Sequence, residues 1–405
     1  MIDKEFIDLE YKPENDIVCT FKIEPSNGLS IEEVAAKVAS ESSVGTWTDL
    51  TRIPERVQRI KARVFYINGN IVKIAYPLDL FEEGNIPQLL SSIAGNIFGM
   101  KAVKNLRLED VEFPLEYLKC FKGAKFGIDG IRKRLNIKNR PLLATVPKPK
   151  VGFDADEFAE VAYESLLGGV DLIKDDENLT NLKFIRFEER LNKVMKTIEK
   201  VEKETGEKKS YLVNITSETK EMLRRAKAVA DYGNEYVMID VLTAGFSALQ
   251  ALRNECEDLN LAIHAHRAMH AAFTRNEKHG IALRVMTKLV RIVGVDNIHV
   301  GTGVGKMVGE VEEVKELADI CRKEWHHLKP IFPVSSGGLH PGLVPSIIEF
   351  FGIDVIIQAG GGIHGHPDGT YAGAKAMREA VELTLKGESL ENGGKELKRA
   401  LEKWG

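Results

Sequence analysis

From about residue 140 onward, the chain alternates short apolar runs with longer amphipathic blocks. The apolar runs are rich in β-branched residues and occupy residues 141–149, 169–176, 210–216, 236–242, 261–266, 297–302, 331–336 and 354–360. Helix-like blocks such as 156–169, 219–233 and 307–323 lie between them. Continuous apolar strands are typical of a parallel sheet buried on both faces, and the alternation indicates repeated strand–helix units. Eight units over roughly 265 residues predict an α/β fold of the (β/α)8 TIM-barrel class, which typically takes about 250 residues.

Each predicted strand ends in a polar residue or a glycine. In chain order these residues are Lys148, Asp176, Asn214, Asp240, His266, Thr302, Ser336 and Gly360. In a barrel of this kind the active site is built at the carboxyl ends of the strands. A random scatter of polar residues would not choose the same end in every strand, so the pattern predicts a catalytic rim there.

The first 128 residues follow a different pattern. Strand-like runs cover 9–25, 63–78 and 103–114, and helix-like runs cover 29–42 and 86–99. This mixture predicts an α+β domain of the ferredoxin-like kind, with an antiparallel sheet and helices on one face. We therefore expect an N-terminal domain over 1–128 and a barrel domain with a C-terminal helical tail over 129–405, connected near 123–137.

The overall composition excludes several classes of protein. Of 405 residues, 43% are hydrophobic and 29% are charged, as in globular proteins with a substantial core. The formal net charge of -4 gives no electrostatic reason to expect nucleic-acid or membrane binding. The charged start lacks the apolar region of a signal peptide, and no run of about 18 apolar residues predicts a membrane span. The four cysteines are scattered without a CxxC pair, so we expect a cytoplasmic protein without a disulfide framework.

The stretch 168–178, GGVDLIKDDEN, places a lysine and three acids at the end of the second predicted strand. Lys174 and Asp176 are two residues apart, so both are expected to face the barrel mouth, and Glu177 follows just past the strand end. Two carboxylates with water and substrate oxygens suit Mg²⁺. Burial near a metal would make the lysine lose its proton more easily, and a neutral amine can add CO₂ to become an anionic carbamate. A structural ion pair is the alternative that this stretch leaves open.

Two glycine-rich turns provide separate evidence for phosphate binding. SSGG (335–338) ends the seventh strand, and AGGG (359–362) ends the eighth. Barrels often bind phosphate with the loops after these strands, because glycine lets backbone N–H groups approach the anion. Arg267 and His299, at the rims of strands five and six, are candidates for a second anion-binding point. Glycines that only form tight turns are the alternative.

Two further motifs suggest other functions that we do not favour. GTGVGKM (301–307) resembles a nucleotide-binding loop, but Met307 stands where a P-loop requires serine or threonine. It is better interpreted as a glycine-hinged lid that carries Lys306 over the barrel mouth, or as a solvated loop. HAHRAMH (264–270) contains an HxH pair like that of some metallohydrolase barrels, where the pair lies on the first strand. Here it lies on the fifth, so His264 is expected to be a packed rim histidine.

Together these motifs resemble the large chain of ribulose-1,5-bisphosphate carboxylase/oxygenase (RuBisCO). The matching segments are ESSVGTWT (41–48), SIAGNIFGMK (92–101), PKPKVG (147–152), GGVDLIKDDEN, HAHRAMHAAFTRN (264–276), HVGTGVGK (299–306), PVSSGG (333–338), QAGGG (358–362) and GHPDG (365–369). They run in the family's order across nearly the whole chain, and two of them, HAHRAMHAAFTRN and HPDGTYAGAKAMREA (366–380), look most like the archaeal form III branch. The resemblance implies carboxylation of ribulose 1,5-bisphosphate to two molecules of 3-phosphoglycerate, and oxygenation of the same substrate.

The resemblance also implies a metal site. Lys174 would carry an activating CO₂ as a carbamate and, with Asp176 and Glu177, would bind Mg²⁺. The metal would coordinate oxygens on C2 and C3 of the bisphosphate and lower the cost of forming an enediolate. The carbamate would abstract the C3 proton.

Three other side chains receive catalytic roles from the same resemblance. Lys148, tuned by the neighbouring Lys150, would donate the final proton at C2. His266 would assist at the C3 hydroxyl during hydration. Lys306 would close over the site and stabilise the carboxylate that develops from CO₂.

The resemblance also implies which residues hold the two substrate phosphates and how the subunits are arranged. One phosphate would be held by Arg267, His299 and Ser336. The other would be held by Thr46, Trp47, Gly338, Gly360 and Gly361, with Gly337 beside them. In the family Glu41, Thr46, Trp47 and Asn96 reach the site from the partner subunit. The resemblance therefore implies a homodimer or an assembly of dimers, with no small subunit.

Two residues of this chain are unusual beside the family pattern, and two other functions are the alternatives to a carboxylase. Pro147 directly precedes Lys148, and Val308 stands where many relatives carry an acid. The nearest alternative is a RuBisCO-like 2,3-diketo-5-methylthiopentyl-1-phosphate enolase of methionine salvage, and a more remote one is a non-catalytic phosphate-binding scaffold. The presence of Glu41, Asn96 and His266 with the lid lysine favours the carboxylase. The form III resemblance implies a role in nucleotide-ribose salvage.

Overall fold

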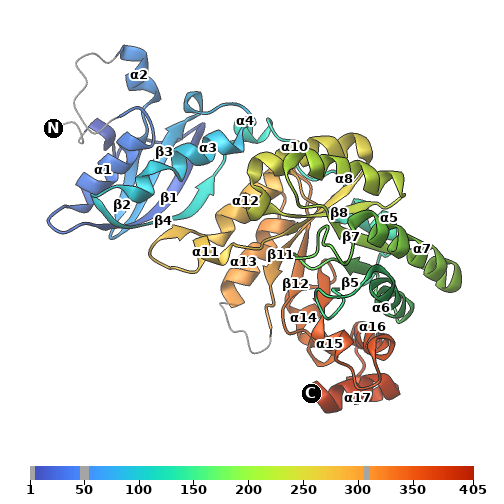
Figure 1. The fold of residues 1–405 in the computed structure, drawn as a ribbon. Helices are drawn as coiled ribbons and strands as arrows, with labels where there is room; N and C mark the ends of the chain where they lie inside the picture. The colour runs from blue at the N-terminus through green and yellow to red at the C-terminus, as the bar shows by residue number, and fades with distance from the viewer. Residues whose placement is uncertain (1–4, 46–53, 305–310) are drawn as a thin grey trace. The chain divides into compact units, whose positions relative to one another are not determined.

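The computed structural model describes residues 5–45, 54–304 and 311–405, and these pack into two compact units (Figure 1). The first unit contains the described residues up to Lys122 together with Met269–Ile292, and the second contains Gly123–Ala268 and Val293–Gly405. This division places residues 123–128 with the barrel. It also groups Met269–Ile292, which the sequence had assigned to the barrel domain, with the N-terminal sheet.

The second unit is a closed barrel of eight parallel strands. In chain order these are β5 (Leu142–Thr145), β6 (Leu172–Lys174), β7 (Ser210–Asn214), β8 (Tyr236–Asp240), β9 (Ala262–His266), β11 (Asn297–Gly301), β12 (Phe332–Ser336) and β13 (Ile356–Ala359). Neighbours in the chain are neighbours in the barrel, and β13 closes it by pairing with β5. Each strand lies within one of the predicted apolar runs, so the TIM-barrel prediction is confirmed.

Helices between the strands cover the outside of the barrel: α6 (Ala155–Leu167), α7 (Phe187–Thr205), α8 (Thr219–Asp231), α10 (Phe246–Leu259), α13 (Val311–Arg322) and α14 (Val344–Phe351) (Figure 1). The unit also contains α5 (Gly127–Leu135) before the first barrel strand, the short α9 (Val241–Ala244), and α15 (Gly361–His364), α16 (Thr370–Lys386) and α17 (Lys395–Trp404) after the last one. Helix α6 begins at a capping box in which Asp154 and Glu157 satisfy each other's backbone N–H groups. Inside the barrel, buried residues such as Leu142, Leu172 and Leu212 form one core with α5.

The first unit is a five-stranded sheet in the order β10-β4-β1-β3-β2. Its strands are β1 (Asp16–Pro25), β2 (Arg63–Asn68), β3 (Ile71–Pro77), β4 (Val103–Glu112) and β10 (Gly280–Ile281). Its helices are α1 (Ile31–Glu41), α2 (Glu55–Ile60), α3 (Ile86–Ile93), α4 (Leu115–Leu118), α11 (Ala271–Thr274) and α12 (Leu283–Val293). Strands β1 to β4 with α1 and α3 follow the βαββαβ order, which confirms the ferredoxin-like prediction.

Two features of this sheet differ from the prediction. The single strand-like run at 63–78 is a hairpin, because the chain turns between β2 and β3 at Gly69, whose φ of 59° favours glycine. The sheet is also not entirely antiparallel, because β10 pairs parallel to β4. A strand of two residues has too short a pattern to be recognised in the sequence.

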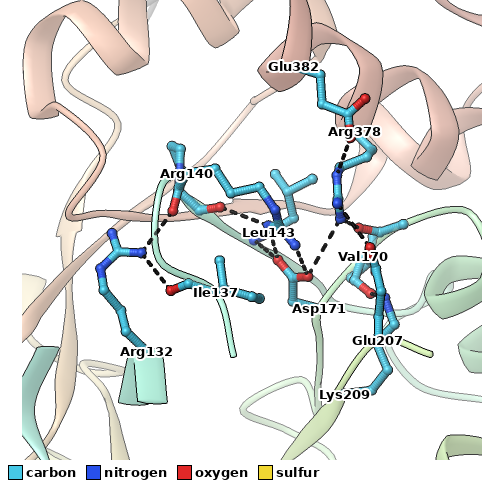
Figure 2. A network of polar contacts seen from close by, with 12 residues as sticks. Arg132, Ile137, Arg140, Leu143, Val170, Asp171, Glu207, Lys209, Arg378 and Glu382 are labelled. Carbon is cyan, nitrogen blue, oxygen red and sulfur yellow. Dashed lines mark hydrogen bonds and ion pairs between the residues drawn. The ribbon is translucent and has the colours of Figure 1, made fainter. Parts of the chain in front are cut away.

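A buried ion network closes the amino-terminal end of the barrel (Figure 2). Arg140 binds the buried Asp171 through both guanidinium nitrogens, at 2.6 Å each, and the same carboxylate accepts a hydrogen bond from the Leu143 backbone at 2.8 Å. Arg378 from α16 lies 3.8 Å from Asp171 and 3.0 Å from Glu207. The network therefore connects the starts of β5 and β6 to α16, at the end opposite the predicted catalytic rim.

None of the helices in the described parts of the chain is both long and apolar enough to cross a membrane.

Candidate active site

The residues predicted to form the catalytic rim lie at the carboxyl ends of the barrel strands. Four are the final residues of their strands: Asn214, Asp240, His266 and Ser336. The other four follow their strands by one to three residues: Lys148, Asp176, Thr302 and Gly360. The rim that the sequence pattern predicted is therefore present in the fold.

Lys174, the last residue of β6, is almost completely buried, with 1% of its surface exposed. Its ammonium donates a hydrogen bond to the Asp175 carbonyl at 2.8 Å. Burial lowers the pKa of Lys174 below its usual value, although the charges of Glu177, Asp240 and Asp176 oppose the shift. This amine is thus easier to deprotonate than an exposed lysine, as carbamate formation requires.

Asp176 and Glu177 remain available as oxygen ligands. Asp176 Oδ1 accepts hydrogen bonds from the backbone and side-chain nitrogens of Asn178, at 3.1 and 3.0 Å, and Lys148 Nζ lies 3.5 Å from Oδ2. Burial alone would raise the pKa of Asp176, but these hydrogen bonds and the nearby lysines hold it below its usual value. Asp176 is therefore ionised, and Glu177 reaches across the rim to within 3.7 Å of His266 Nε2.

Asp175 has a separate, structural role. Its completely buried carboxylate accepts hydrogen bonds from Arg190 of α7 at 3.0 Å, the Tyr211 hydroxyl at 2.5 Å and the Asn214 backbone at 2.8 Å. Side chains alternate along a strand, so Asp175 points away from the face shared by its two neighbours. The ion-pair interpretation of this stretch therefore fits Asp175, and it leaves Asp176 and Glu177 free for a ligand.

Asn214 was placed at the rim by the sequence but was given no role. Its side-chain amide donates to the Glu177 carbonyl at 3.1 Å and to the Asp176 carbonyl at 3.4 Å. It thereby fixes the backbone of both candidate ligands. Polar residues at strand ends were the only available signal, because the contact joins residues 37 positions apart.

His266 is oriented by a carboxylate that the sequence also left without a role. His266 Nδ1 lies 2.9 Å from Asp240 Oδ1 and 3.3 Å from the Ala268 backbone nitrogen, and Nε2 faces Glu177. Asp240 is in turn fixed by Thr216, whose hydroxyl accepts a hydrogen bond from the Asp240 backbone at 2.9 Å. The imidazole is thus held in one orientation above the candidate metal ligands.

The residues predicted to form the second anion-binding point lie around His299. The rings of His266 and His299 lie 4.9 Å apart, and His299 Nδ1 lies 2.8 Å from the Ser336 hydroxyl. A Cβ added at Gly301 would lie 3.7 Å from Arg267 Nη2, so the arginine also borders this region. Burial lowers the pKa of Arg267 to about 10, at which the guanidinium is still charged near pH 7.

The glycine turns reach the same rim. Gly337 and Gly338 have φ values of 108° and 68°, which favour glycine, and Thr302 donates to the carbonyls of Ser336 and Gly337. A Cβ at Gly360 would approach Lys148 Cε to 3.1 Å. The Gly360 turn therefore borders the lysine that contacts Asp176, which brings the predicted phosphate and metal residues into one site.

Several predicted residues do not belong to this described cluster. Thr46, Trp47, Lys306 and Val308 lie outside the described residues. Glu41 ends α1, Asn96 begins a short 3-10 helix (Asn96–Gly99), and both belong to the first unit. Lys150 is exposed. The predicted roles of all these residues remain predictions.

His264, expected to be a packed rim histidine, is completely buried, and its Nε2 lies 3.0 Å from His299 Nε2. Among the described residues, no three His, Cys, Asp or Glu side chains are gathered to hold a metal ion.

A partly buried histidine behind the glycine turn gives a testable pH dependence. His364 Nε2 lies 2.9 Å from the Thr145 hydroxyl and Nδ1 lies 3.1 Å from the Thr370 hydroxyl, and burial lowers its pKa to about 4. Between pH 6.5 and 4 the unfolded chain then binds more protons at this site than the folded chain. We expect the free energy of unfolding to fall by about 1 kcal/mol or more from pH 6.5 to 5 through this residue.

Urea unfolding at pH 7.5, 6.5 and 5 would measure this effect, with His364→Gln as the comparison. The variant should lose part of the pH dependence. Burial lowers the pKa values of His264 and His299 well below 6.5, so these two residues contribute in the same direction. An identical pH dependence in both proteins would show that His364 is not the titrating group.

Comparisons with known proteins agree along the whole chain. Residues 5–117 match the family model "Ribulose bisphosphate carboxylase large chain, N-terminal domain", and residues 127–404 match "Ribulose bisphosphate carboxylase large chain, catalytic domain". The ribulose bisphosphate carboxylase of Pyrococcus furiosus is 57% identical over 409 residues, covering 99% of this chain and 97% of the relative. That of Pyrococcus abyssi is 56% identical over 409 residues, covering 99% and 96%.

Solved structures give the same result. The octameric RuBisCO of Pyrococcus horikoshii OT3, crystallised with sulfate, has a TM-score of 0.97 and 54% identity, covering 100% of this chain and 97% of that one. The dimeric archaeal RuBisCO of Hyperthermus butylicus has a TM-score of 0.96 and 50% identity, with both chains covered completely. The two family models together span nearly the entire sequence. This chain therefore belongs to the RuBisCO large-chain family and is similar throughout to its archaeal members.

Proposed function

We propose that this chain is a ribulose-1,5-bisphosphate carboxylase, which enolises the bisphosphate, adds CO₂ and cleaves the product to two molecules of 3-phosphoglycerate. The observation that carries the proposal is the buried amine of Lys174, with a lowered pKa, beside two carboxylates at the barrel rim. The curated relatives above, which are named ribulose bisphosphate carboxylases, support the same activity.

The donor set fits a magnesium ion. Asp176 and Glu177 would supply hard oxygen ligands, and a carbamate on Lys174 would supply a third anionic donor. RuBisCO enzymes generally use Mg²⁺ and a carbamylated lysine. When bound, Mg²⁺ would polarise the substrate oxygens and offset the negative charge that develops on them.

Side chains of this protein would then move the protons. Lys174, once carbamylated, would take the C3 proton. Lys148, held 3.5 Å from Asp176, would return a proton at C2. His266, oriented by Asp240, would accept or donate a proton at the C3 oxygen through Nε2. Each group comes from a different strand end, which fixes their spacing before the substrate arrives.

Two phosphate sites would hold the ends of the substrate. Arg267, His299 and Ser336 would form one, and the turns at Gly338 and Gly360 would form the other. The positive φ of Gly338 and the close approach of Gly360 to Lys148 support glycine at both places. Lysine and arginine charges on the same rim favour a doubly anionic ligand.

The site would be completed by a second copy of the chain. We propose that Glu41, Thr46, Trp47 and Asn96 reach the partner's barrel, so that a homodimer is the smallest active unit. The Hyperthermus relative is described as dimeric and the Pyrococcus horikoshii relative as octameric. We expect dimers or an assembly of dimers without a small subunit, acting in nucleotide-ribose salvage.

Fixation of ¹⁴CO₂ into 3-phosphoglycerate, with and without preincubation in Mg²⁺ and CO₂, tests the proposal. Preincubation should raise the activity. The same preparation should be offered 2,3-diketo-5-methylthiopentyl 1-phosphate, followed by its ultraviolet absorbance. Turnover of this diketone without CO₂ fixation would assign the chain to the enolases, and no reaction with either substrate would assign it to the non-catalytic scaffolds.

Lys306 provides a test of the lid. Lys306→Ala should stop carboxylation while it spares enolisation, because the lysine would act on the carboxylate formed after the enediolate. Exchange of the C3 proton with solvent tritium measures enolisation separately from ¹⁴CO₂ fixation. Equal loss of both activities would contradict the role assigned to Lys306.

A further inference from the structure

A set of hydrogen bonds joins the first and last barrel strands just below the predicted catalytic rim. Thr145 ends β5 and Ala359 ends β13, and the two residues are paired in the register of these strands. The Thr145 hydroxyl donates a hydrogen bond to the Ala359 carbonyl at 2.6 Å, and its oxygen lies 2.9 Å from His364 Nε2. His364 is the last residue of α15, the short helix that follows the Gly360 turn. One imidazole thus connects this turn to the end of β5.

These contacts fix the proton of the imidazole. A hydroxyl carries one proton and a carbonyl oxygen can only accept, so the Thr145 proton points to Ala359. The Thr145 oxygen must therefore accept a hydrogen bond from His364 Nε2–H. Burial lowers the pKa of His364 to about 4, so the ring is neutral near pH 7 and carries this proton alone. Its Nδ1 then accepts a hydrogen bond from the Thr370 hydroxyl at 3.1 Å, and both ring nitrogens have a partner.

The same turn borders the stem of Lys148. A Cβ added at Gly360 would lie 3.1 Å from Lys148 Cε and 3.8 Å from the Val146 carbonyl oxygen. Besides burial, the positive charge of Lys148 lowers the pKa of His364, and the Val146 carbonyl opposes the shift, so both groups lie near the imidazole. Because His364 is neutral, it can donate to the strand end without placing a second positive charge beside the lysine.

The position of the Lys148 ammonium depends on this strand end. Lys148 follows β5 by three residues, and 38% of its side chain is exposed. Among the described residues, the polar group that its ammonium contacts is Asp176 Oδ2, at 3.5 Å, which is long for a hydrogen bond. This contact alone holds the tip of the side chain only weakly. The backbone below Lys148 must therefore be fixed if the ammonium is to stay in one place.

We propose that His364 is a positioning residue, which fixes the end of β5 through Thr145 and thereby holds the Lys148 ammonium at the rim. The part of that ammonium as the donor of the C2 proton rests on the proposed function. A residue that only filled space would be better apolar, because a partly buried imidazole loses some of its hydration.

A displaced Lys148 would change the products as well as the rate. Cleavage of the hydrated intermediate leaves a carbanion at C2 of one 3-phosphoglycerate half, which needs a proton. If the proton arrives late, the C2 electron pair forms a double bond to the phosphate-bearing carbon, and the bond from that carbon to the phosphate oxygen breaks. Inorganic phosphate leaves, and the enol that remains becomes pyruvate when its terminal carbon gains a proton and its hydroxyl loses one. The ratio of pyruvate to 3-phosphoglycerate therefore measures proton delivery at C2, whatever the amount of folded protein.

Two variants of His364 and one control test the proposal with ribulose bisphosphate as substrate. In His364→Leu the donor is lost, and we expect the product ratio to rise about tenfold, because a small displacement of a reacting group costs that much in rate. His364→Gln keeps an N–H donor that can reach Thr145, so its ratio should stay within about threefold of the original protein. His366→Leu is the control. His366 lies in the same segment and is buried, but it contacts the Glu396 carbonyl at 2.8 Å, so its loss should leave the ratio unchanged.

Crystal structures of the same variants test the position of the lysine without any activity. In His364→Leu we expect the end of β5 to shift and Lys148 Nζ to move away from Asp176, whereas His364→Gln should keep both in place. If the leucine variant does not fold, Thr145→Val removes the same hydrogen bond with a side chain of the same shape. It should then have the effects expected of His364→Leu.

A product ratio that stayed unchanged in His364→Leu, or a Lys148 that stayed beside Asp176, would overturn the proposal. An equal rise of the ratio in His364→Gln or His366→Leu would do the same, because the shape of the segment would then matter and the hydrogen bond would not. If the unaltered protein fixed no CO₂ while Lys148 moved in the leucine variant as expected, the proposed function would fail and the positioning role would stand.

Discussion

Replacing Lys174 by methionine should abolish CO₂ fixation, with a loss of about 10³-fold or more, because the site would lose a metal ligand and a base together. Methionine fills the buried space of the lysine stem without an amine that can react with CO₂. The variant should also lose the activation by preincubation with Mg²⁺ and CO₂. Radiometric assays with and without preincubation would measure both effects.

Lys209 provides a matched control for this experiment. Its side chain is also completely buried in the barrel, but it lies at the opposite end, where its ammonium contacts Glu207 and the Val170 carbonyl at 2.8 Å. Lys209→Met should lower stability and leave activation by CO₂ intact. If Lys174→Met kept normal turnover, or if both variants lost activation equally, the carbamate proposal would have to be abandoned.

Replacing Asp171 by asparagine should lower the free energy of unfolding by about 3–5 kcal/mol, the typical cost of leaving a buried charge without its partner. Asp171 is completely buried and neutralises Arg140, with Arg378 nearby (Figure 2). With asparagine at position 171, the positive charges of Arg140 and Arg378 would no longer be balanced by this carboxylate. Denaturant unfolding followed by far-ultraviolet circular dichroism would measure the change.

An exposed ion pair gives the comparison for Asp171. Glu199 and Lys203 are 2.6 Å apart on the outer face of α7, with more than half of each side chain exposed. Glu199→Gln should leave the free energy of unfolding almost unchanged, because solvent screens such pairs. The Asp171→Asn protein that does fold should have the same KM for the bisphosphate as the original protein, because the network lies away from the rim. A stability loss as small as that of Glu199→Gln would contradict the structural role of Asp171.

The barrel strands were predictable because their pattern is local. A strand such as 210–216 is apolar at every position, which is required when helices cover one side of a parallel sheet and the core fills the other. The position of the rim followed from the same pattern, since parallel strands place their carboxyl ends together. The two-residue strand β10 was missed because its pairing with β4 depends on residues about 170 positions away.

The candidate site was only partly predictable from the sequence. The spacing of Lys174 and Asp176 placed both on one face, and the structure has Asp176 in contact with Lys148 at the rim. The same spacing did not show that Asp175 is neutralised by Arg190, whose helix begins well after the strand. Nor did it show that Asn214 fixes the backbone of the ligand segment, because a strand-end asparagine can have many partners.

The sequence by itself determined the number and order of the barrel strands, the end at which the chemistry lies and the family to which the chain belongs. These follow from local periodicity and from short motifs, which do not depend on distant residues. Only the tertiary structure showed that Asp175 pairs with Arg190, that Asn214 fixes the backbone of the candidate ligands and that His264 contacts His299. Such assignments depend on which side chains meet across different strands, and burial then sets their protonation.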